Sequence, residues 1–292
     1  SVASRGLGDV YKRQENLLFE QFLNRLKKTT DEGRSAAVKK RHQLGLRSAR
    51  ENLSDLVDDQ SFLEYGAFAV AAQRSRKKYE DLQIDTAADG IITGFCKINS
   101  DVVGDKKAHA ACIIYDYSVL AGTQGYFHHM KLDRLCEKVR EYGLPIVIFT
   151  EGGGGRPGDT DVTTSVAGLH VPSFANWAGL SGKCLRIAVN NGFCFAGNAA
   201  LFGSADIRIA TKNSWIGMAG PAMIEGGGLG KFSPKEIGPS NIQEKNGVID
   251  FIAEDEKEAT KIAKKILSYF QGNESEWKVL DQSQLINIMP KD

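Results

Sequence analysis

No excess of charge of either sign marks this chain. Its 37 basic residues are balanced by 36 acidic ones, which gives a net charge of +1. A protein that binds nucleic acid or an anionic membrane through its overall field carries a larger basic excess. We therefore expect neither nucleic acid nor a membrane as a partner, and any anionic ligand should meet a local cluster of basic side chains.

Cysteine is scarce, and so are long apolar runs. The five cysteines are odd in number and scattered. They form no CxxC pair, and no histidine lies near them at the spacing of metal ligands. This pattern predicts neither a disulfide framework nor a zinc site, so we expect no metal in this chain. Apolar runs long enough to cross a membrane and the pattern of a secretory signal are also missing.

Three common catalytic motifs are absent or broken. A formal GxGxxG occurs at Gly153, Gly155 and Gly158, but Pro157 interrupts it and no acidic residue follows about 20 positions later. Gly230-Lys231 lacks the other positions of a P-loop, and no GxSxG elbow is present. These gaps argue against a dinucleotide fold, a P-loop nucleotidase and a serine hydrolase.

The periodicity that is present predicts an α/β protein. Residues 15–60 read as an N-terminal helical segment with a basic cluster that includes Arg47 and Arg50. Residues 61–272 alternate between strand and helix signals, as parallel strands joined by crossover helices do. The ranges with these signals are strand-like 61–73, 90–98, 108–117, 145–150, 186–189, 207–210 and 214–217, helical 126–142, 162–178 and 254–270, and a polar loop at 74–89.

The two ends of the chain carry no such periodicity. Residues 1–14 read as an extraneous or processed leader, and residues 273–292 as the start of an interdomain linker before a C-terminal half.

One stretch, residues 190–230, has the clearest functional signal. The turn-prone Asn190-Asn191-Gly192 precedes a run of small residues, and a helix is expected to begin at Gly197 and Asn198. The first amides of a helix have no acceptor in the helix, and the helix dipole favours negative charge there. This predicts an oxyanion hole, although the same small residues would also permit close packing of helix and strand.

A second glycine-rich turn follows the strand at 145–150. Its sequence Glu151-Gly152-Gly153-Gly154-Gly155-Arg156 predicts another strand-to-helix turn with bare amides. Since the two turns follow neighbouring parallel strands, they could face one carbonyl oxygen.

The order of these motifs resembles the N-terminal half of the carboxyltransferase component, of the beta subunit type, of biotin-dependent acyl-CoA carboxylases. That component is a branch of the crotonase superfamily. The resemblance covers about residues 40–292 and is carried by Ser48-Ala49-Arg50-Glu51, Asp59 to Gly66, Ala88-Asp89-Gly90, Asp116 to Val119, Gly122 to Gly125, Gly153 to Arg156, Ala196 to Ala199, Gly217 to Pro221, Glu236-Ile237-Gly238 and Glu254 to Ala259.

The resemblance implies a crotonase-like β-β-α spiral with an N-terminal helical extension. It also implies transfer of a carboxyl group from carboxybiotin, on a carrier protein, to the α-carbon of an acyl-CoA of the acetyl, propionyl or methylcrotonyl class. Expected partners are the biotin carboxyl carrier, the biotin carboxylase, a C-terminal carboxyltransferase half and further copies of the chain, in bacterial cytoplasm or mitochondrial matrix.

Site residues follow from the same resemblance. The amides of Gly197 and Asn198 are expected to hold one enolate oxygen. The expected substrate-binding residues are Gly153, Gly154, Gly155, Arg156, Ala196, Ala199, Arg47 and Arg50.

The chain departs from the family pattern at Asn198, where many members have glycine, and this places a side chain near the acyl group. Two alternatives stay open. A single-chain crotonase-type decarboxylase or hydratase would need its own carboxylate, for which Glu151, Asp159 and Glu225 are the candidates. An incomplete fragment would bind CoA without catalysis. If a partner half exists, the face with residues 196–201 and 215–223 should be apolar.

Overall fold

The computed structural model describes residues 16–162 and 171–272, together with residues 281, 283 and 288. The expected leader at 1–14 lies outside the described residues, and so does most of the expected linker at 273–292. Residues 163–170, the centre of the helix expected at 162–178, lie outside them as well.

A seven-stranded sheet forms the centre of the chain, with its strands in sequence order. The pairs β1–β2 and β2–β3 are antiparallel, and every later neighbouring pair, from β3–β4 to β6–β7, is parallel. The strands are β1 (Leu63–Tyr65), β2 (Ile91–Lys97), β3 (His109–Tyr115), β4 (Ile146–Phe149), β5 (Arg186–Phe195), β6 (Ile207–Gly217) and β7 (Phe251–Ala253).

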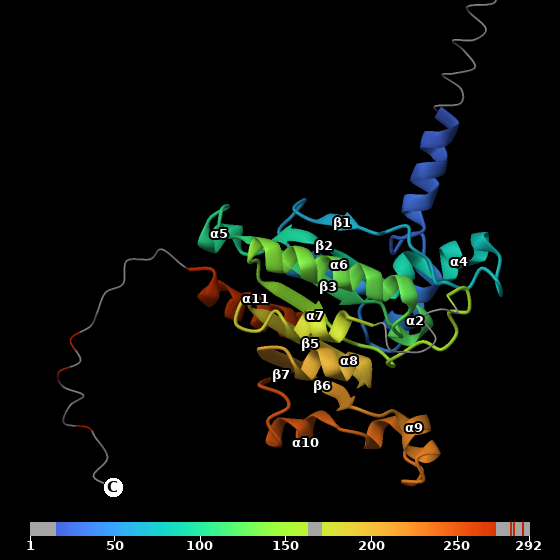
Figure 1. The fold of residues 1–292 in the computed structure, drawn as a ribbon. Helices are drawn as coiled ribbons and strands as arrows, with labels where there is room; N and C mark the ends of the chain where they lie inside the picture. The colour runs from blue at the N-terminus through green and yellow to red at the C-terminus, as the bar shows by residue number, and fades with distance from the viewer. Residues whose placement is uncertain (1–15, 163–170, 273–280, 282, 284–287, 289–292) are drawn as a thin grey trace, which may run out of the picture.

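Helices connect and cover these strands (Figure 1). A helix over 16–27 comes first. The α-helices that follow are α2 (Ser35–Gln43), α3 (Ala49–Leu56), α4 (Tyr79–Asp85), α5 (Ser100–Val103), α6 (Tyr126–Tyr142), α7 (Ser173–Ala178), α8 (Gly197–Gly203), α9 (Pro221–Gly226), α10 (Ser240–Lys245) and α11 (Glu256–Phe270). Short 3₁₀ helices are η1 (Ala87–Gly90), η2 (Leu120–Gly122) and η4 (Pro234–Glu236).

Each face of the sheet buries its own apolar cluster. Alternate strand residues point to opposite faces, so Ile148 of β4 packs with α6, α7 and α8, whereas Phe149 packs with α3 and α11. Figure 1 shows α6, α7 and α8 together on one side of the sheet. The structure is therefore a three-layer α/β arrangement, in agreement with the predicted class.

Local sequence signals explain where the main helices begin and end. A capping box of Ser48 and Glu51 starts α3, and the Asp255 side chain accepts the Glu258 amide at the start of α11. Helix α6 spans the predicted residues 126–142 and ends at Gly143, whose φ of +65° suits glycine. None of the described helices is long and apolar enough to cross a bilayer.

The turn predicted at Asn190-Asn191-Gly192 is wrong. Strand β5 continues through these residues to Phe195, and the register with β6 shifts between Asn190 and Gly192. This irregularity is a bulge, in which the extra residue is accommodated without ending the strand. Strand β6 likewise runs unbroken through residues 207–217, where two separate strands were predicted.

The region before β2 also differs from the prediction. Of the strand-like run 61–73, only Leu63–Tyr65 pairs in the sheet. The predicted loop at 74–89 contains α4 and most of η1. Polar residues cover the exposed side of α4, so its single buried apolar residue, Leu82, gave too weak a pattern to be recognised.

Candidate functional site

Helix α8 begins at the end of β5 and leaves its first amides free. Ala196 precedes the helix with φ +50°, a strained value for a residue with a side chain, and its amide donates to the Gly217 carbonyl at 3.0 Å. The first helical hydrogen bond runs from the Ala200 amide to the Ala196 carbonyl at 2.9 Å. Among the described residues, none accepts from the amides of Gly197 or Asn198. They are unpaired donors at the positive end of the helix dipole; Gly197 is half-buried and Asn198 is fully buried.

The Asn198 side chain does not project toward a ligand, so that expectation is wrong. It is fully buried, and its Oδ1 accepts the Gly154 amide at 3.0 Å. Its Nδ2 donates to the carbonyl oxygens of Thr150 at 3.1 Å and Gly122 at 3.3 Å. Asn198 therefore ties α8 to the two loops that face it. Ala199, the next residue, is buried in the apolar cluster and contacts no pocket.

The glycine loop at 152–156 is not the strand-to-helix turn that was predicted. No helix follows it in the described residues before α7, and four of its five amides are engaged. The bonds are Gly152 to Phe193 at 2.7 Å, Gly153 to Ala121 at 3.0 Å, Gly154 to Asn198 at 3.0 Å and Arg156 to Gln124 at 2.9 Å. Gly155 alone keeps an amide with no acceptor among the described residues.

Arg156 was expected to line the substrate path, and it is among the residues that line the Gly155 pocket described below, but its guanidinium is buried in the fold. It forms an ion pair with Asp89 and donates to the Thr123 carbonyl at 2.8 Å. The side chain is 4% exposed, so it stabilises the loop from within.

The expected anion-binding pair Arg47 and Arg50 is also engaged with protein carboxylates. Arg47 pairs with Asp55 at 2.7 Å, and Arg50 binds Glu64 through both of its terminal nitrogens, at 2.6 and 3.0 Å. A guanidinium held in this way has little capacity left for a phosphate. The nearby Lys40 is exposed and has no described partner.

Two pockets flank the turn at 120–124. The first, here named the Gly155 pocket, has a volume of about 590 Å³ and is lined by Gln124, Tyr126, His129, Met130, Gly155 and Pro172 among others. The second, the Lys40 pocket, has about 560 Å³ and is lined by Arg34, Lys40, Lys77, Ile84, Ser118 and Leu120 among others. Both volumes are in the range of small-molecule sites.

The turn between the pockets carries the glycine loop. Ala121 accepts the Gly153 amide, and the Gln124 amide donates to the Gly154 carbonyl at 2.8 Å. A side chain on Gly197 would meet Gln124 Oε1 at 2.1 Å, so Gln124 packs directly over the start of α8. Gln124 therefore connects the start of α8 with the wall of the Gly155 pocket, to which Gly155 also belongs.

The Gly155 pocket has a neutral imidazole in its wall. The His129 ring nitrogen Nδ1 lies 2.9 Å from the Ser173 hydroxyl, and burial lowers the pKa of His129 to about 4. Asp159, at the same pocket, accepts the Tyr126 amide at 2.8 Å. His128 is fully buried beneath the pocket, and its ring stacks edge-on against Tyr115. These contacts indicate a packing role for His128.

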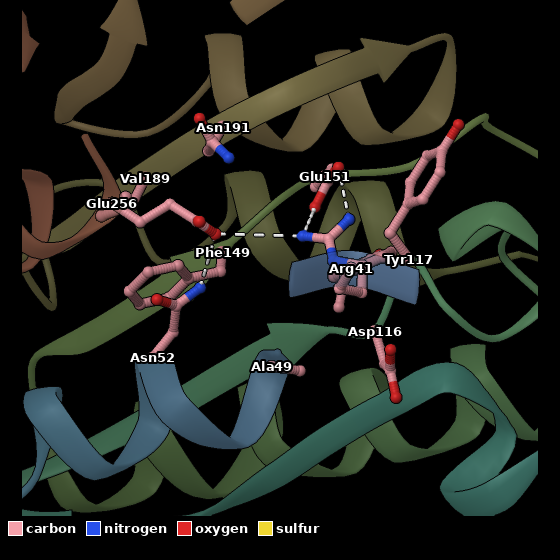
Figure 2. Close-up of a pocket in the computed structure, with 11 residues that line it drawn as sticks. Arg41, Ala49, Asn52, Asp116, Tyr117, Phe149, Glu151, Val189, Asn191 and Glu256 are labelled. Atoms are coloured by element: carbon pink, nitrogen blue, oxygen red, sulfur yellow. Dashed lines mark hydrogen bonds and ion pairs between the residues drawn. The ribbon is translucent and has the colours of Figure 1, made fainter. Parts of the chain in front are cut away.

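The opposite face of the sheet holds a buried ion network that the sequence analysis missed (Figure 2). Glu151 binds Arg41 through both oxygens, at 2.9 and 2.7 Å, and Glu256 lies 3.9 Å from the same guanidinium. Arg41 was visible only as part of a basic run. The alternation of β4 could have indicated that Glu151 faces away from α8, because it continues the side of Phe149.

The apolar face expected for a partner half is only partly present. Met218 and Met223, in the segment 215–223, are 66% and 64% exposed. Asn198, Ala199 and Leu201 are buried, whereas Ala196, Gly197 and Ala200 are partly exposed. In the described residues no three His, Cys, Asp or Glu side chains are grouped so that they could hold a metal ion.

Comparison with known proteins places this geometry in context. Residues 40–292 match the family described as the carboxyl transferase domain. The methylmalonyl-CoA carboxyltransferase 12S subunit of Propionibacterium freudenreichii subsp. shermanii is 32% identical over 249 residues, which are 84% of this chain and 44% of that protein. The biotin-dependent long chain acyl-coenzyme A carboxylase beta4 subunit of Mycobacterium tuberculosis is 28% identical over 85% of this chain and 44% of its own length.

A solved single-chain, multi-domain long-chain acyl-CoA carboxylase superposes with a TM-score of 0.86 and 50% identity, over 93% of this chain and 27% of that one. This likeness confirms the predicted crotonase-like α/β fold. The chain spans less than half the length of the curated relatives it matches.

Proposed function

Because the chain belongs to the carboxyl transferase domain family, we propose that it is the acyl-CoA-binding half of a biotin-dependent carboxyltransferase. The observation that carries this proposal is the pair of unpaired amides at Gly197 and Asn198, over which Gln124, a wall residue of the Gly155 pocket, packs. The reaction would move a carboxyl group to the α-carbon of an acyl-CoA.

The chemistry needs a site for negative charge on the thioester oxygen. When the α-carbon loses its proton, electron density moves to that oxygen and an enolate forms. Two preorganised amides at the positive end of α8 would stabilise the enolate. Each donor of this kind lowers the activation barrier by roughly 3 kcal/mol. No side-chain acid or base of this chain is assigned the proton, because biotin that has released CO2 would accept it, and the CO2 would then form the new bond to the α-carbon.

The rest of the substrate would lie along the turn at 120–124. The Gly155 pocket would take the acyl group, next to the Gly155 amide, with Gly153 and Gly154 shaping the path. The Lys40 pocket would take the CoA phosphates, since Lys40 has no described partner and Lys77, which pairs with Asp85 at 3.3 Å, lines the same pocket. This replaces Arg47 and Arg50 in the phosphate role.

The carboxyl donor would come from outside this chain. Carboxybiotin on a carrier protein supplies the carboxyl group in this proposal, and we assign no described residue to hold it. A complementary carboxyltransferase half, a biotin carboxylase and further copies of the chain complete the proposed assembly. The exposed Met218 and Met223 are candidates for contact with the complementary half.

The single-chain alternative has less support because none of its three carboxylates is available. Glu151 is on the far face of the sheet, held by Arg41. Asp159 accepts from the Tyr126 amide, and Glu225 pairs with Lys231 at 2.9 Å on the surface. The remaining alternative is a fragment that only binds CoA. It would use the same site as the proposed carboxyltransferase half but would have no catalytic activity.

Two measurements on the purified chain test the proposal. Calorimetry should detect binding of an acyl-CoA by the chain alone, and decarboxylation of malonyl-CoA with free biotin should occur only after the complementary half is added. Robust turnover by the chain alone would contradict the proposal and favour the single-chain enzyme. Binding without turnover in the complete assembly would support the CoA-binding fragment.

A further inference from the structure

Glu151 connects the glycine loop to the N-terminal helices. It is the second residue after β4 and the immediate neighbour of Gly152. Its Oε1 accepts Arg41 Nη1 at 2.9 Å and its Oε2 accepts Arg41 Nη2 at 2.7 Å. The two side chains are only 11% and 10% exposed. This is a bidentate pair, the arrangement that fixes both partners most strictly in orientation.

Three helices converge on this pair. Arg41 belongs to α2, and its Nε donates to the Arg47 carbonyl at 2.9 Å, just before α3. Glu256, the first residue of α11, accepts the Arg47 amide at 2.8 Å and Asn52 Nδ2 of α3 at 3.0 Å. Figure 2 shows Arg41 between Glu151 and Glu256. The position of Glu151 is therefore set by α2, α3 and α11 together.

The sheet is deformed in a way that makes room for this carboxylate. A side chain on Gly192 would place its Cβ 2.5 Å from Glu151 Oε1, and Gly192 has φ +90°. Gly192 lies at the bulge of β5 that the sequence analysis took for a turn. The glycine and the bulge together leave the space that the Glu151 carboxylate occupies.

The main chain of Glu151 also supports the turn opposite. A Cβ on Gly122 would lie 2.3 Å from the Glu151 carbonyl oxygen, so the two backbones are in direct contact. From this point the loop continues to Gly153 and Gly154, whose amides are held by Ala121 and Asn198. A shift of Glu151 would move both walls of the proposed acyl site.

We propose that Glu151, clamped by Arg41, is a positioning residue that holds the glycine loop in the conformation needed for carboxyl transfer. The catalytic part of this proposal rests on the proposed function, whereas the structural part stands without it. Glu151 does not touch the substrate. A buried ion pair adds little to stability against an apolar pair of the same shape, so its value lies in fixing one geometry.

The charge of Glu151 changes near neutral pH. Burial raises the pKa of Glu151 to about 7, against the attraction of Arg41 and with the help of repulsion from Glu256 and Asp116. The Tyr117 ring lies beside the Arg41 guanidinium, 5.7 Å away, and burial raises the pKa of Tyr117. As pH rises toward about 7, the closed loop therefore loses the stability that it had from keeping Glu151 protonated.

Hydrogen exchange on this chain tests the structural part. In Glu151→Gln at pH 8, the protection factors of the Gly153 and Gly154 amides should fall about tenfold, while those of β2 and β3 stay unchanged. Asp250→Asn is the matched control, because Asp250 also binds an arginine, Arg208, in a bidentate pair at 2.7 and 3.0 Å. It should leave the loop as in wild type.

The outcomes separate positioning from general stability. Loop protection in Glu151→Gln equal to wild type would overturn the proposal. A fall of the same size in β2 and β3 would overturn it too, because it would show a purely global effect. In wild type, loop protection should decrease as pH rises from 6 toward 7 and level off above it, because the open loop loses the Glu151 proton before the closed loop does, and this decrease should be absent in Glu151→Gln.

Kinetics of the complete carboxyltransferase test the catalytic part. Glu151→Gln should lower kcat about 10- to 100-fold with little change in KM for the acyl-CoA, because the loop is misplaced by a fraction of an ångström while the pockets remain. The part of the pH dependence of kcat near 7 that comes from Glu151 should disappear. A fully active variant with the wild-type pH profile would overturn positioning. Failure of the wild type to transfer carboxyl would instead overturn the proposed function and leave the exchange result standing.

Discussion

The start of α8 and the glycine loop at 152–156 are alike in composition and unlike in structure. Both follow neighbouring parallel strands and both are rich in small residues. The amides of Gly197 and Asn198 are open, whereas four of the five amides in the loop are bound. Glycine content therefore does not create an anion site. The open donors come from the helix start, where geometry leaves amides without helical acceptors.

Asn198 makes this difference possible. Its backbone contributes one open donor, and its side chain occupies the Gly154 amide of the loop. The backbone of Asn198 therefore adds an unpaired donor to the start of α8, while its side chain accepts a donor of the glycine loop. The following predictions separate these two contributions, beginning with the largest expected effect.

Asn198→Pro and Asn198→Ala both remove the side-chain bonds, but only proline removes the amide. Proline is tolerated in a first helical turn. In the complete enzyme, kcat of Asn198→Pro should be roughly 100- to 1,000-fold below that of Asn198→Ala, with similar affinity for CoA. Steady-state kinetics with calorimetry and melting curves measure this. Equal kcat in two folded variants would show that the amide has no catalytic role.

The side chain of Asn198 should appear in stability. Asn198→Ala leaves the Gly154 amide and two carbonyl oxygens buried without their partner. We expect a loss of about 3 kcal/mol in the free energy of unfolding, measured by urea denaturation. Ser204→Ala, at an exposed hydroxyl near the end of the same helix, is the control and should change stability by less than about 0.5 kcal/mol. A small loss for Asn198→Ala would mean that the loop is held by other contacts.

Alanine substitution should destabilise two neighbouring glycines of the loop to different extents. Gly154 has φ +89°, and its Cβ would lie 2.7 Å from the Ala196 Cβ, while a Cβ on Gly155 would meet nothing within 4 Å. Gly154→Ala should lower the free energy of unfolding by about 1–3 kcal/mol, and Gly155→Ala by less than about 0.5 kcal/mol. Thermal denaturation of the pair measures this contrast. Equal losses would contradict the closed geometry of the loop.

His129 should report how dry the Gly155 pocket is. Its folded pKa of about 4 lies below the unfolded value near 6.5, so the unfolded chain takes up the proton first as pH falls. Stability should therefore be lost below pH 6.5, by about 2 kcal/mol at pH 5, and His129→Gln should lose less. Burial also lowers the pKa of His128, so His128 contributes a stability loss of the same sign. Because His128 is present in both the wild type and His129→Gln, its contribution cancels in the comparison. An identical pH dependence of Tm would show that His129 is solvated.

Much of this fold followed from local signals. Helix α6 matches the predicted range because its apolar stripe and terminal Gly143 act locally, and the strands β2, β3 and β4 are short apolar runs between turns. The bulge of β5 could not be predicted, since Asn190-Asn191-Gly192 has turn propensity, whereas in the fold the strand pairs with β6 on both sides of the bulge and the Glu151 carboxylate lies beside Gly192. Tertiary contact overrides propensity at that point.

The site was predicted in part for the same reason. The open amides of α8 follow from where a helix begins, which is a local property. Whether an arginine is available for a ligand depends on its ion pairs. Arg47 pairs with Asp55, Arg50 with Glu64 and Arg156 with Asp89, and the fold brings these partners together. The role of the Asn198 side chain could not be read from composition either, because its acceptors and donor lie 44 to 76 residues away in sequence.

The most direct test of the central claim is the amide NMR shift of Gly197 and Asn198 on addition of an acyl-CoA. The control ligand is a thioether analogue in which a methylene replaces the thioester carbonyl, so that it fills the same pockets without the oxygen. If these amides hold that oxygen, both proton signals should move downfield with the thioester and stay nearly unchanged with the thioether. Equal shifts with the two ligands, or none with a thioester that demonstrably binds, would contradict the oxyanion site at α8.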